Sequence, residues 1–577
     1  MLCIILVIAI SGTTRSGTAA EQTAGVDSKV YPNAVVAADH PLASAAGIAI
    51  LKAGGNVVDA AVATSFALSV LRPASCGLGG GGFMVIWDAE QQKSMVIDYR
   101  ERAPAAATPD MYSRLPGSDV QRQLASRQGP LAVAVPCNVA GLCYAVKEYG
   151  KLDLKTVMQP AILMARRGVP INDHMRSVQK SMLARMKQGK LDQKEFQPLI
   201  DEYLNHGKPW EEKARFFSPQ LKVLELIAEN GRAGFYEGPV ADAIVATCGK
   251  QGGGILTLQD LKDTEPIIRK PLTTSFDGYQ ILTMPPPSSG GIAIIESFNM
   301  IDALEKQILK HPFADLKFHS PQELHYLTEV MKHAFADRAE YLGDADFVPV
   351  PLERLTDPQY ASHLAARIDA KRTKKLKDYG RYVSPRDSGT SHLSVIDVSG
   401  NAVACTETIN LTFGSYVVIP KYGIVMNNEM DDFAAIPGKP NAFGLLQSKA
   451  NEIEPGKKPL SSMSPTIAVK DGKAVFSAGA SGGPRIISST LQVMLNMIVF
   501  GMQPEQAVES PRIHHQWVPE DLLLEQELYK QAGEQLKQFG HTIKKSSSLA
   551  ATQAVSRQSD GLRGHSDTRK HGAAAGY

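Results

Sequence analysis

The segment around residue 390 constrains the fold of this chain more than any other part of its sequence. Residues 370–389 carry KRTKK, then Gly, Pro and DSG, without an apolar period, which indicates a charged, turn-rich linker. Two strand-like runs follow at 391–398 (SHLSVIDV) and 402–408 (AVACTET), and the SGN turn at 399–401 joins them as a hairpin. The pattern therefore changes from a linker to a buried sheet at Thr390.

Further hairpins and helices surround this transition. A DG turn, Asp471-Gly472, joins the runs 465–470 and 473–480 and predicts a second hairpin. After a glycine-rich stretch, Pro484 starts a helix that is expected to end near Phe500.

The N-terminal part begins with helices rich in small residues. His40-Pro41 opens the first helix and Gly54-Gly55 ends it. Asn56 caps the second, Val57 to Leu71, and strand-like runs follow at 83–88 and 95–100. Sheets alternating with packed helices predict a mixed α/β (α+β) fold of stacked layers around one large core.

Composition excludes several classes of function. The 577 residues include 61 Lys and Arg against 59 Asp and Glu, a net charge of +2, so no electrostatic reason exists to expect a nucleic acid partner. The cysteines after Cys3 have no C-x-x-C or Cys/His metal spacing and are expected to be buried free thiols. We therefore expect no cofactor and no metal.

The N-terminus is interpreted as a targeting segment. An unbroken apolar run, Leu2 to Ile10, precedes the small residues Thr18-Ala19-Ala20. Nine apolar residues are far fewer than the roughly 20 that a membrane-spanning helix needs. Residues 1–20 are thus predicted to be a signal peptide, and the protein to be exported, periplasmic or extracellular.

Thr390 is a candidate nucleophile because of where it lies. Cleavage of the Gly389–Thr390 bond would place a hydroxyl and a free α-amine on one residue. An α-amine has a pKa of about 7.7–8.0, so its neutral form can act as general base for its own hydroxyl. Alone, however, a threonine at the start of a strand is more often structural.

A set of longer motifs carries a family resemblance. In order along the chain they are DHPLAS, AGGNVVDAAVA, SCGLGGGGFM, DYRERAP, SGTSHLSVID, TETIN, NNEMDDF, PLSSMSPTIAV, GASGGPR, PRIHHQW and AAAGY. Together they resemble the γ-glutamyltranspeptidase family from about Val35 to Tyr577.

The resemblance implies a four-layer αββα sandwich of the N-terminal-nucleophile hydrolase type, formed by two subunits from one precursor. Self-cleavage at Gly389–Thr390 would give subunits 21–389 and 390–577, which remain together as a heterodimer. The implied reaction passes the γ-glutamyl group of glutathione through an ester on Thr390 to water, an amino acid or a dipeptide.

Residue roles follow motif by motif from the same resemblance. Thr408 is expected to bond to the nucleophile, and Gly482 with Gly483, between a strand and a helix N-terminus, to stabilise the oxyanion.

An amino-acid head group needs one cation and one anion to bind it. The matching residues are Arg100, Ser461 and Ser462 for the carboxylate and Asp432 for the ammonium, with Glu429 and Asn410 assisting. Arg102 stays open as a competitor of Arg100, two positions on and on the same strand face. Asp431 is expected to be structural, since adjacent strand residues point to opposite faces.

Two other functions compete with this interpretation. A relative of the same fold could hydrolyse glutaryl side chains of β-lactams, but such substrates have no ammonium for Asp432. An uncleaved relative could serve only as a binding protein, which the intact Thr390, Gly482, Gly483 and Arg100 argue against. Phe443, in the region 434–453 that matches the family's lid loop, cannot donate a hydrogen bond to Asn410, and His514-His515 is expected to be a packed turn.

Overall fold

The computed structural model describes residues 29–189, 191–380, 390–436, 441–442 and 448–577. The predicted signal peptide, Gly389 and Phe443 lie outside these described residues.

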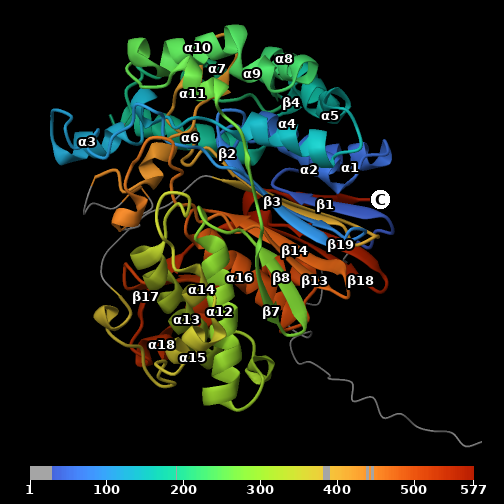
Figure 1. Cartoon of the computed structure of the whole chain (residues 1–577), viewed down its shortest axis with the longest axis vertical. Coiled ribbons are helices and arrows are strands. Elements are labelled where there is room, and N and C mark those ends of the chain that lie inside the picture. Colours follow the sequence, from blue (N-terminus) through green and yellow to red (C-terminus); the bar gives the residue numbers. More distant parts are fainter. Residues whose placement is uncertain (1–28, 190, 381–389, 437–440, 443–447) are drawn as a thin grey trace, which may run out of the picture.

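Two antiparallel sheets form the centre of the molecule (Figure 1). The seven-stranded sheet has the order β20 (Ala573–Gly576), β1 (Ala34–Ala38), β9 (Ser391–Asp397), β10 (Ala402–Thr408), β2 (Gly81–Asp88), β3 (Lys93–Tyr99), β6 (Ile267–Arg269). The six-stranded sheet has the order β19 (Gly561–Ser566), β18 (Ala551–Gln558), β14 (Lys473–Ser481), β13 (Thr466–Lys470), β8 (Tyr279–Thr283), β7 (Leu272–Phe276). Buried apolar side chains of both sheets meet between them, among them Val35, Phe83, Leu282, Ile467 and Val555.

Helices cover the outer face of each sheet, which completes the predicted αββα sandwich (Figure 1). Over the first sheet pack α1 (Pro41–Lys52), α2 (Val57–Leu71), α4 (Asn138–Tyr149), α5 (Leu154–Arg167), α6 (Asp173–Lys187), α7 (Gln197–Tyr203), α8 (Leu221–Asn230), α9 (Ala233–Tyr236) and α10 (Gly238–Cys248). Over the second pack α12 (Gly290–Leu304), α13 (Pro321–Tyr341), α15 (Pro358–Ala365), α16 (Arg485–Ile498), α17 (Pro504–Glu509) and α18 (Gln526–Gln538). The remaining described helices and strands are α3 (Asp119–Ala125), α11 (Leu258–Lys262), α14 (Leu352–Leu355), β4 (Val169–Pro170), β5 (Arg215–Phe216), β11 (Val418–Ile419), β12 (Ile424–Val425), β15 (Ile513–His514), β16 (Asp521–Glu525) and β17 (Thr542–Ser546).

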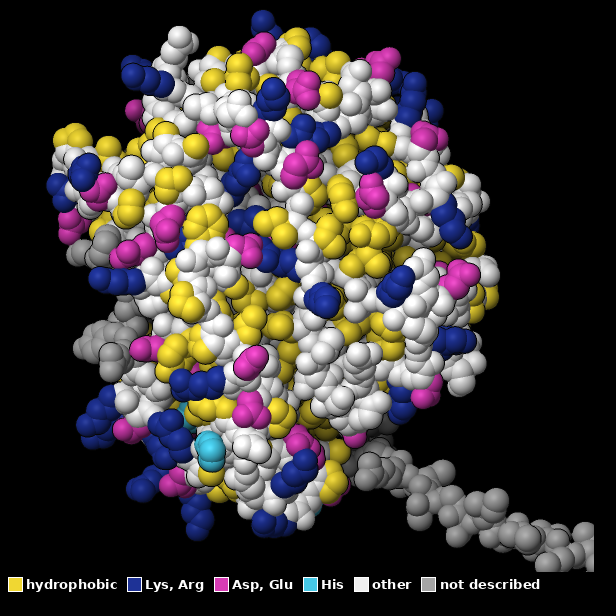
Figure 2. Space-filling model, in the orientation of Figure 1, with side chains coloured by type: hydrophobic (Ala, Val, Ile, Leu, Met, Phe, Trp, Pro, Cys, Tyr) yellow, Lys and Arg dark blue, Asp and Glu magenta, His cyan; other side chains and the backbone are white. Residues whose placement is uncertain are grey.

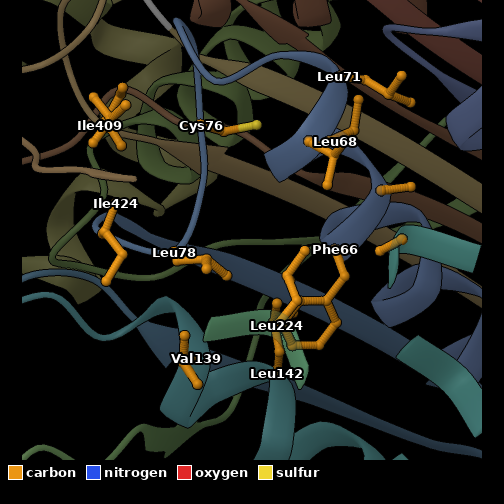
Figure 3. Packing of buried hydrophobic residues seen from close by; sticks show 14 of the residues in the cluster. Phe66, Leu68, Leu71, Cys76, Leu78, Val139, Leu142, Leu224, Ile409 and Ile424 are labelled. Carbon is orange, nitrogen blue, oxygen red and sulfur yellow. The ribbon is translucent and has the colours of Figure 1, made fainter. Parts of the chain in front are cut away.

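The first two helices begin where their capping residues predict. His40 accepts a hydrogen bond from the Leu42 amide, and Asn56 forms a capping box with Asp59. Every residue of α2 is buried, and Figure 3 shows Phe66, Leu68 and Leu71 of this helix among apolar side chains of neighbouring elements. A helix this rich in alanine can approach its neighbours closely.

In both sheets, strands from before residue 390 pair with strands from after it. In the first sheet β9 pairs with β1 on one side and with β10 on the other, and β10 then pairs with β2. In the second sheet β13 pairs with β8. The segments before and after residue 390 therefore share both cores, and neither has a core of its own.

Three smaller findings bear on the sequence predictions. Cys76, Cys137, Cys248 and Cys405 are buried free thiols as expected, whereas Cys143 is only partly buried. Within the described ranges no helix is both long and apolar enough to cross a membrane. On the face shown in Figure 2, basic and acidic side chains are interspersed.

Close packing yields a stability test at Gly141 in α4. A Cβ there would lie 2.3 Å from Cγ of the buried Tyr99 ring, which is too close for any real contact. We expect Gly141→Ala to destabilise the protein by about 1–3 kcal/mol through overpacking. In the matched variant Gly533→Ala, on α18, the new Cβ meets only the flexible end of Ile543 at 3.0 Å. Its loss should be small, since alanine favours helix by up to about 1 kcal/mol. Thermal unfolding of both variants checks the difference, and equal melting temperatures would contradict it.

Candidate active site

Thr390 lies directly before β9 and is 5% exposed. Its hydroxyl donates a hydrogen bond of 3.1 Å to Oγ1 of Thr408, which in turn accepts from the Asn410 amide at 2.8 Å. The register of the predicted hairpin explains this contact, because Ser391 is paired with Glu407 and their neighbours meet at the same end. Thr390 has a φ of 139°, a strained backbone conformation for a β-branched residue.

A glycine turn faces the nucleophile from the second sheet. Gly482 and Gly483 have φ values of 141° and 57° and connect β14 to α16. A side chain at Gly482 would meet the Ala550 backbone at 2.9 Å. Such a turn at a helix N-terminus can direct backbone N–H groups toward an anion.

One cavity brings together all of the predicted site residues except Gly482. Its walls are formed by Arg100, Thr390, Thr408, Asn410, Glu429, Asp432, Leu460, Ser461, Ser462, Met463, Gly483 and Ile486. Gly482 lines an adjoining cavity that also includes Thr390. Leu460, Met463 and Ile486 were not predicted; they flank predicted residues in the sequence, which is the one signal that could have indicated them.

Arg100 is the centre of charge in this cavity and is 1% exposed. Its guanidinium donates to Asp432 Oδ2 at 2.7 Å, contacts Glu429 and lies 3.6 Å from Glu101. Nε donates to the Pro459 carbonyl at 3.3 Å. The carboxylate of Glu101 was not predicted, although it is adjacent in sequence.

Arg102 does not share the cavity. The expectation that it lies on the same strand face is wrong, because β3 ends at Tyr99 and the side-chain alternation ends with it. Arg102 instead donates to the Asp260 carbonyl at 3.1 Å.

The carboxylates around Arg100 have perturbed pKa values. Burial raises the pKa of Asp432 to about 6 and that of Glu101 to about 7, in each case against the opposing effect of Arg100. Burial also raises the pKa of Glu429 well above its usual range. For Arg100, burial alone would lower the pKa, but the charges of Glu429, Glu101 and Asp432 raise it on balance.

Asp431 and Asp432 both lie in a 3₁₀ turn, Glu429–Asp432, and not in a strand. The strand argument for Asp431 was therefore wrong in its premise. Asp431 accepts hydrogen bonds from Ser126 Oγ at 2.7 Å and from Arg127 Nε at 2.9 Å. Asp431 does not line the cavity, whereas Asp432 does.

The Ser461 segment is supported from behind by the loop before α12. The Ser289 amide and hydroxyl donate to the Ser461 carbonyl at 2.8 and 2.6 Å, and the Ser461 amide donates to Pro287. Arg338 of α13, 1% exposed, donates through Nε to Ser289 Oγ at 3.0 Å. Burial lowers the pKa of Arg338 to about 10, opposed by Asp432. No role for this loop was predicted from the sequence.

Histidines occur in two buried clusters outside the cavity. His514 bonds to Ser488 Oγ at 2.7 Å and His515 accepts from the Trp517 amide, so both are packed as expected, but His514 ends strand β15 and does not lie in a turn. His325, Glu329 and His541 bring possible metal-ligand atoms within 4.8 Å of one another. Lys332 lies 3.0 Å from Glu329 and already balances its charge.

The layers and the site together define a class of protein. A buried threonine opens a central strand of an αββα sandwich, facing a glycine turn at a helix N-terminus, and this is the arrangement of an N-terminal-nucleophile hydrolase. A sequence profile described as Gamma-glutamyltranspeptidase matches residues 43–577. The chain belongs to the γ-glutamyltranspeptidase family.

Individual relatives agree with this assignment. The chain is 41% identical over 498 residues to a glutathione hydrolase proenzyme of Pseudomonas sp. (strain A14), covering 85% of this chain and 83% of the relative. It is 39% identical over 549 residues to a glutathione hydrolase proenzyme of Escherichia coli (strain K12), covering 94% and 92%. Its fold is similar to the crystal structure of a cephalosporin acylase from Bacillus halodurans, with a TM-score of 0.82, 26% identity and 99% of both chains covered.

Proposed function

We propose that this chain is a precursor that cleaves its Gly389–Thr390 bond and then uses Thr390 to transfer or hydrolyse the γ-glutamyl group of glutathione and related amides. The observation that carries the proposal is that one buried cavity joins the hydroxyl of Thr390 to a guanidinium and carboxylates suited to an amino-acid head group. Residues 21–389 and 390–577 would be the two subunits.

Self-cleavage begins with the hydroxyl of Thr390. Its oxygen attacks the Gly389 carbonyl, the peptide nitrogen leaves as the α-amine, and water hydrolyses the resulting ester. The strained φ of Thr390 supports this step, because breaking the peptide bond removes the constraint. The shared sheets support a heterodimer that stays assembled after cleavage.

Turnover uses the same oxygen on another carbonyl. The freed α-amine accepts the hydroxyl proton as Oγ1 attacks the γ-carbonyl, and N–H groups at Gly482 and Gly483 stabilise the oxyanion. The proton passes to the departing amine, which leaves a γ-glutamyl ester on Thr390. Water, an amino acid or a dipeptide then attacks this ester.

Recognition of the head group is an exchange of ion pairs. Arg100, Ser461 and Ser462 bind the α-carboxylate, and Asp432 binds the ammonium with Glu429 and Asn410 beside it. The pKa of Asp432, raised to about 6, still leaves its carboxylate ionised at neutral pH. Each ion of the substrate thus replaces one partner of the existing Arg100–Asp432 pair.

Hydrolysis of glutaryl side chains is a second candidate, favoured by the likeness in fold to the cephalosporin acylase. A glutaryl group presents no cation to Asp432. Its carboxylate would compete with Asp432 for Arg100 without offering Asp432 a cation in exchange, which argues for the γ-glutamyl substrate. Export to the periplasm or the exterior is proposed from residues 1–20 alone.

Thr390→Ala should abolish both maturation and turnover, because one hydroxyl performs both. A denaturing gel and the release of a chromogenic amine from a γ-glutamyl anilide, with and without an acceptor dipeptide, measure the two steps. Thr390→Ser keeps a hydroxyl and should still mature. Two chains in the alanine variant would disprove the assignment, and a single uncleaved chain in the native protein would indicate a binding protein.

Arg100→Lys should weaken γ-glutamyl substrates while leaving maturation intact. Lysine keeps the charge but loses the forked geometry, and a charge-assisted hydrogen bond contributes about 1.5–3 kcal/mol. We expect kcat/KM to fall roughly ten- to hundred-fold. The control is Arg102→Lys, outside the cavity, which should change kcat/KM little; the reverse pattern would move the carboxylate role to Arg102.

Asp432→Asn separates the two candidate substrates. It should strongly reduce kcat/KM for a γ-glutamyl anilide, whose ammonium loses its partner. A glutaryl anilide should be a poor substrate of the native enzyme and should lose far less, since it never used the carboxylate. Equal native activity on the two anilides, or an equal loss on mutation, would contradict the γ-glutamyl assignment.

A further inference from the structure

Lys570 reaches the nucleophile from near the end of the chain. Its ammonium donates to the Thr390 carbonyl oxygen at 2.6 Å and to Ser481 Oγ, next to the glycine turn, at 3.2 Å. It also donates to Ser391 Oγ at 3.4 Å, and its ionic partner is the carboxylate of Asp39, which is fully buried. Lys570, Thr390, Ser481 and Gly482 all line the cavity that adjoins the head-group cavity.

The surrounding protein holds this ammonium in place. Asp39, between β1 and α1, accepts a second hydrogen bond from Gln553 Nε2 at 2.6 Å. Arg72, 1% exposed at the end of α2, donates to the backbone carbonyls of both Asp39 and Lys570 at 2.6 Å. Asp39 and Arg72 precede the proposed cleavage point, whereas Lys570 follows it. One subunit thus fixes a charge beside the nucleophile of the other.

The ammonium also lies close to the nitrogen that cleavage would release. The α-nitrogen and the carbonyl oxygen of one residue are three bonds apart, so Lys570 Nζ is within about 6 Å of the Thr390 nitrogen. A like charge at this distance disfavours protonation of an amine. The carboxylate of Asp39 opposes that effect, so the two residues act on the amine with opposite signs.

We propose that Lys570 is a positioning residue for Thr390, which fixes its strained carbonyl and keeps the released α-amine neutral, while Asp39 moderates the charge. This inference rests on the proposed role of Thr390 as an N-terminal nucleophile. It assigns a function to the C-terminal segment and to a buried carboxylate that the proposed reaction does not otherwise use.

Other titratable groups around this network do not replace Lys570. Burial, assisted by Arg72, lowers the pKa of His40 to about 3 and that of His174 to about 2, so both are neutral. Burial raises the pKa of the Cys76 thiol to about 12 and that of Glu407 to about 7. The remaining charged or titratable neighbours are Arg72, Arg485, Arg569 and His571. Glu407 is one neighbour expected to titrate near neutral pH, so Glu407→Gln serves as a background variant.

The experiment follows the reaction of Thr390 with a small sulfonyl fluoride between pH 5 and 10. Oγ1 attacks sulfur, fluoride leaves, and the hydroxyl proton passes to the α-amine. The reagent has no amino-acid head group, so its binding does not use the Arg100–Asp432 pair. Mature native enzyme is compared with Lys570→Met, Lys570→Arg and Asp39→Asn, each checked first for two chains on a denaturing gel.

The acidic limb of the pH–rate profile should move in opposite directions in the Lys570→Met and Asp39→Asn variants. We expect Lys570→Met to shift it upward by about one pH unit or more and Asp39→Asn to shift it downward. Lys570→Arg should leave it in place, as should Lys544→Met, which removes an exposed lysine paired with Asp521. The shifts should persist in the Glu407→Gln background.

Other outcomes would overturn the proposal. An acidic limb at the same pH in the native, Lys570→Met and Asp39→Asn proteins would leave Lys570 with only a structural role. If Lys570→Met does not mature, the Asp39→Asn profile decides, and an unmoved limb there is equally decisive. Labelling that persists in Thr390→Ala would instead contradict the proposed nucleophile.

Discussion

The pairing of β9 with its neighbours is the constraint on which the rest of the site depends. Because β9 is held between β1 and β10, the residue before it is fixed at the end of a central strand. Its position therefore does not depend on where the preceding segment lies. That residue is Thr390, whose side chain meets Thr408 from β10. The second sheet then brings β14 and its glycine turn to the same end. Thr390 and the glycine turn are thus positioned by the two sheets.

Electrostatics divides this region into two compartments on either side of Thr390. On one side Arg100 faces the carboxyl groups of Glu101, Glu429 and Asp432. Because these acidic groups accompany the basic one, this side can bind an incoming cation as well as an anion. On the other side Lys570 and Asp39 are already paired, with Arg72 holding their backbone. The charged groups around Arg100 can exchange their partners for those of a substrate, whereas Lys570 and Asp39 already neutralise each other. In the proposed roles of these residues, recognition and tuning of reactivity are therefore separated in space.

Local chemistry explains which elements could be predicted from the sequence. The hairpins, α1 and α2 form where turn and capping residues indicate, since these signals act within a few positions. The errors at Arg102 and Asp431 share one cause: strand alternation was extended beyond the end of a strand. Ser289, Arg338 and Lys570 were missed because their partners lie far away in sequence; Thr390 and Lys570, for example, are 180 positions apart. Nine of the ten predicted site residues came together because family motifs, and not periodicity, located them.

The pairing of strands from the two segments in both sheets has a consequence for folding. An intact chain folds in a unimolecular reaction, in which β9 finds β1 and β13 finds β8 within one molecule. Once the chain is cut before Thr390, complete unfolding would release two polypeptides, and recovery would become bimolecular and dependent on concentration. Neither piece has a separate core to hold a folded intermediate. After cleavage, the lifetime of the folded protein would be set by its rate of unfolding and not by a reversible folding equilibrium. The height of the unfolding barrier would then keep the mature protein folded, because it could no longer refold readily.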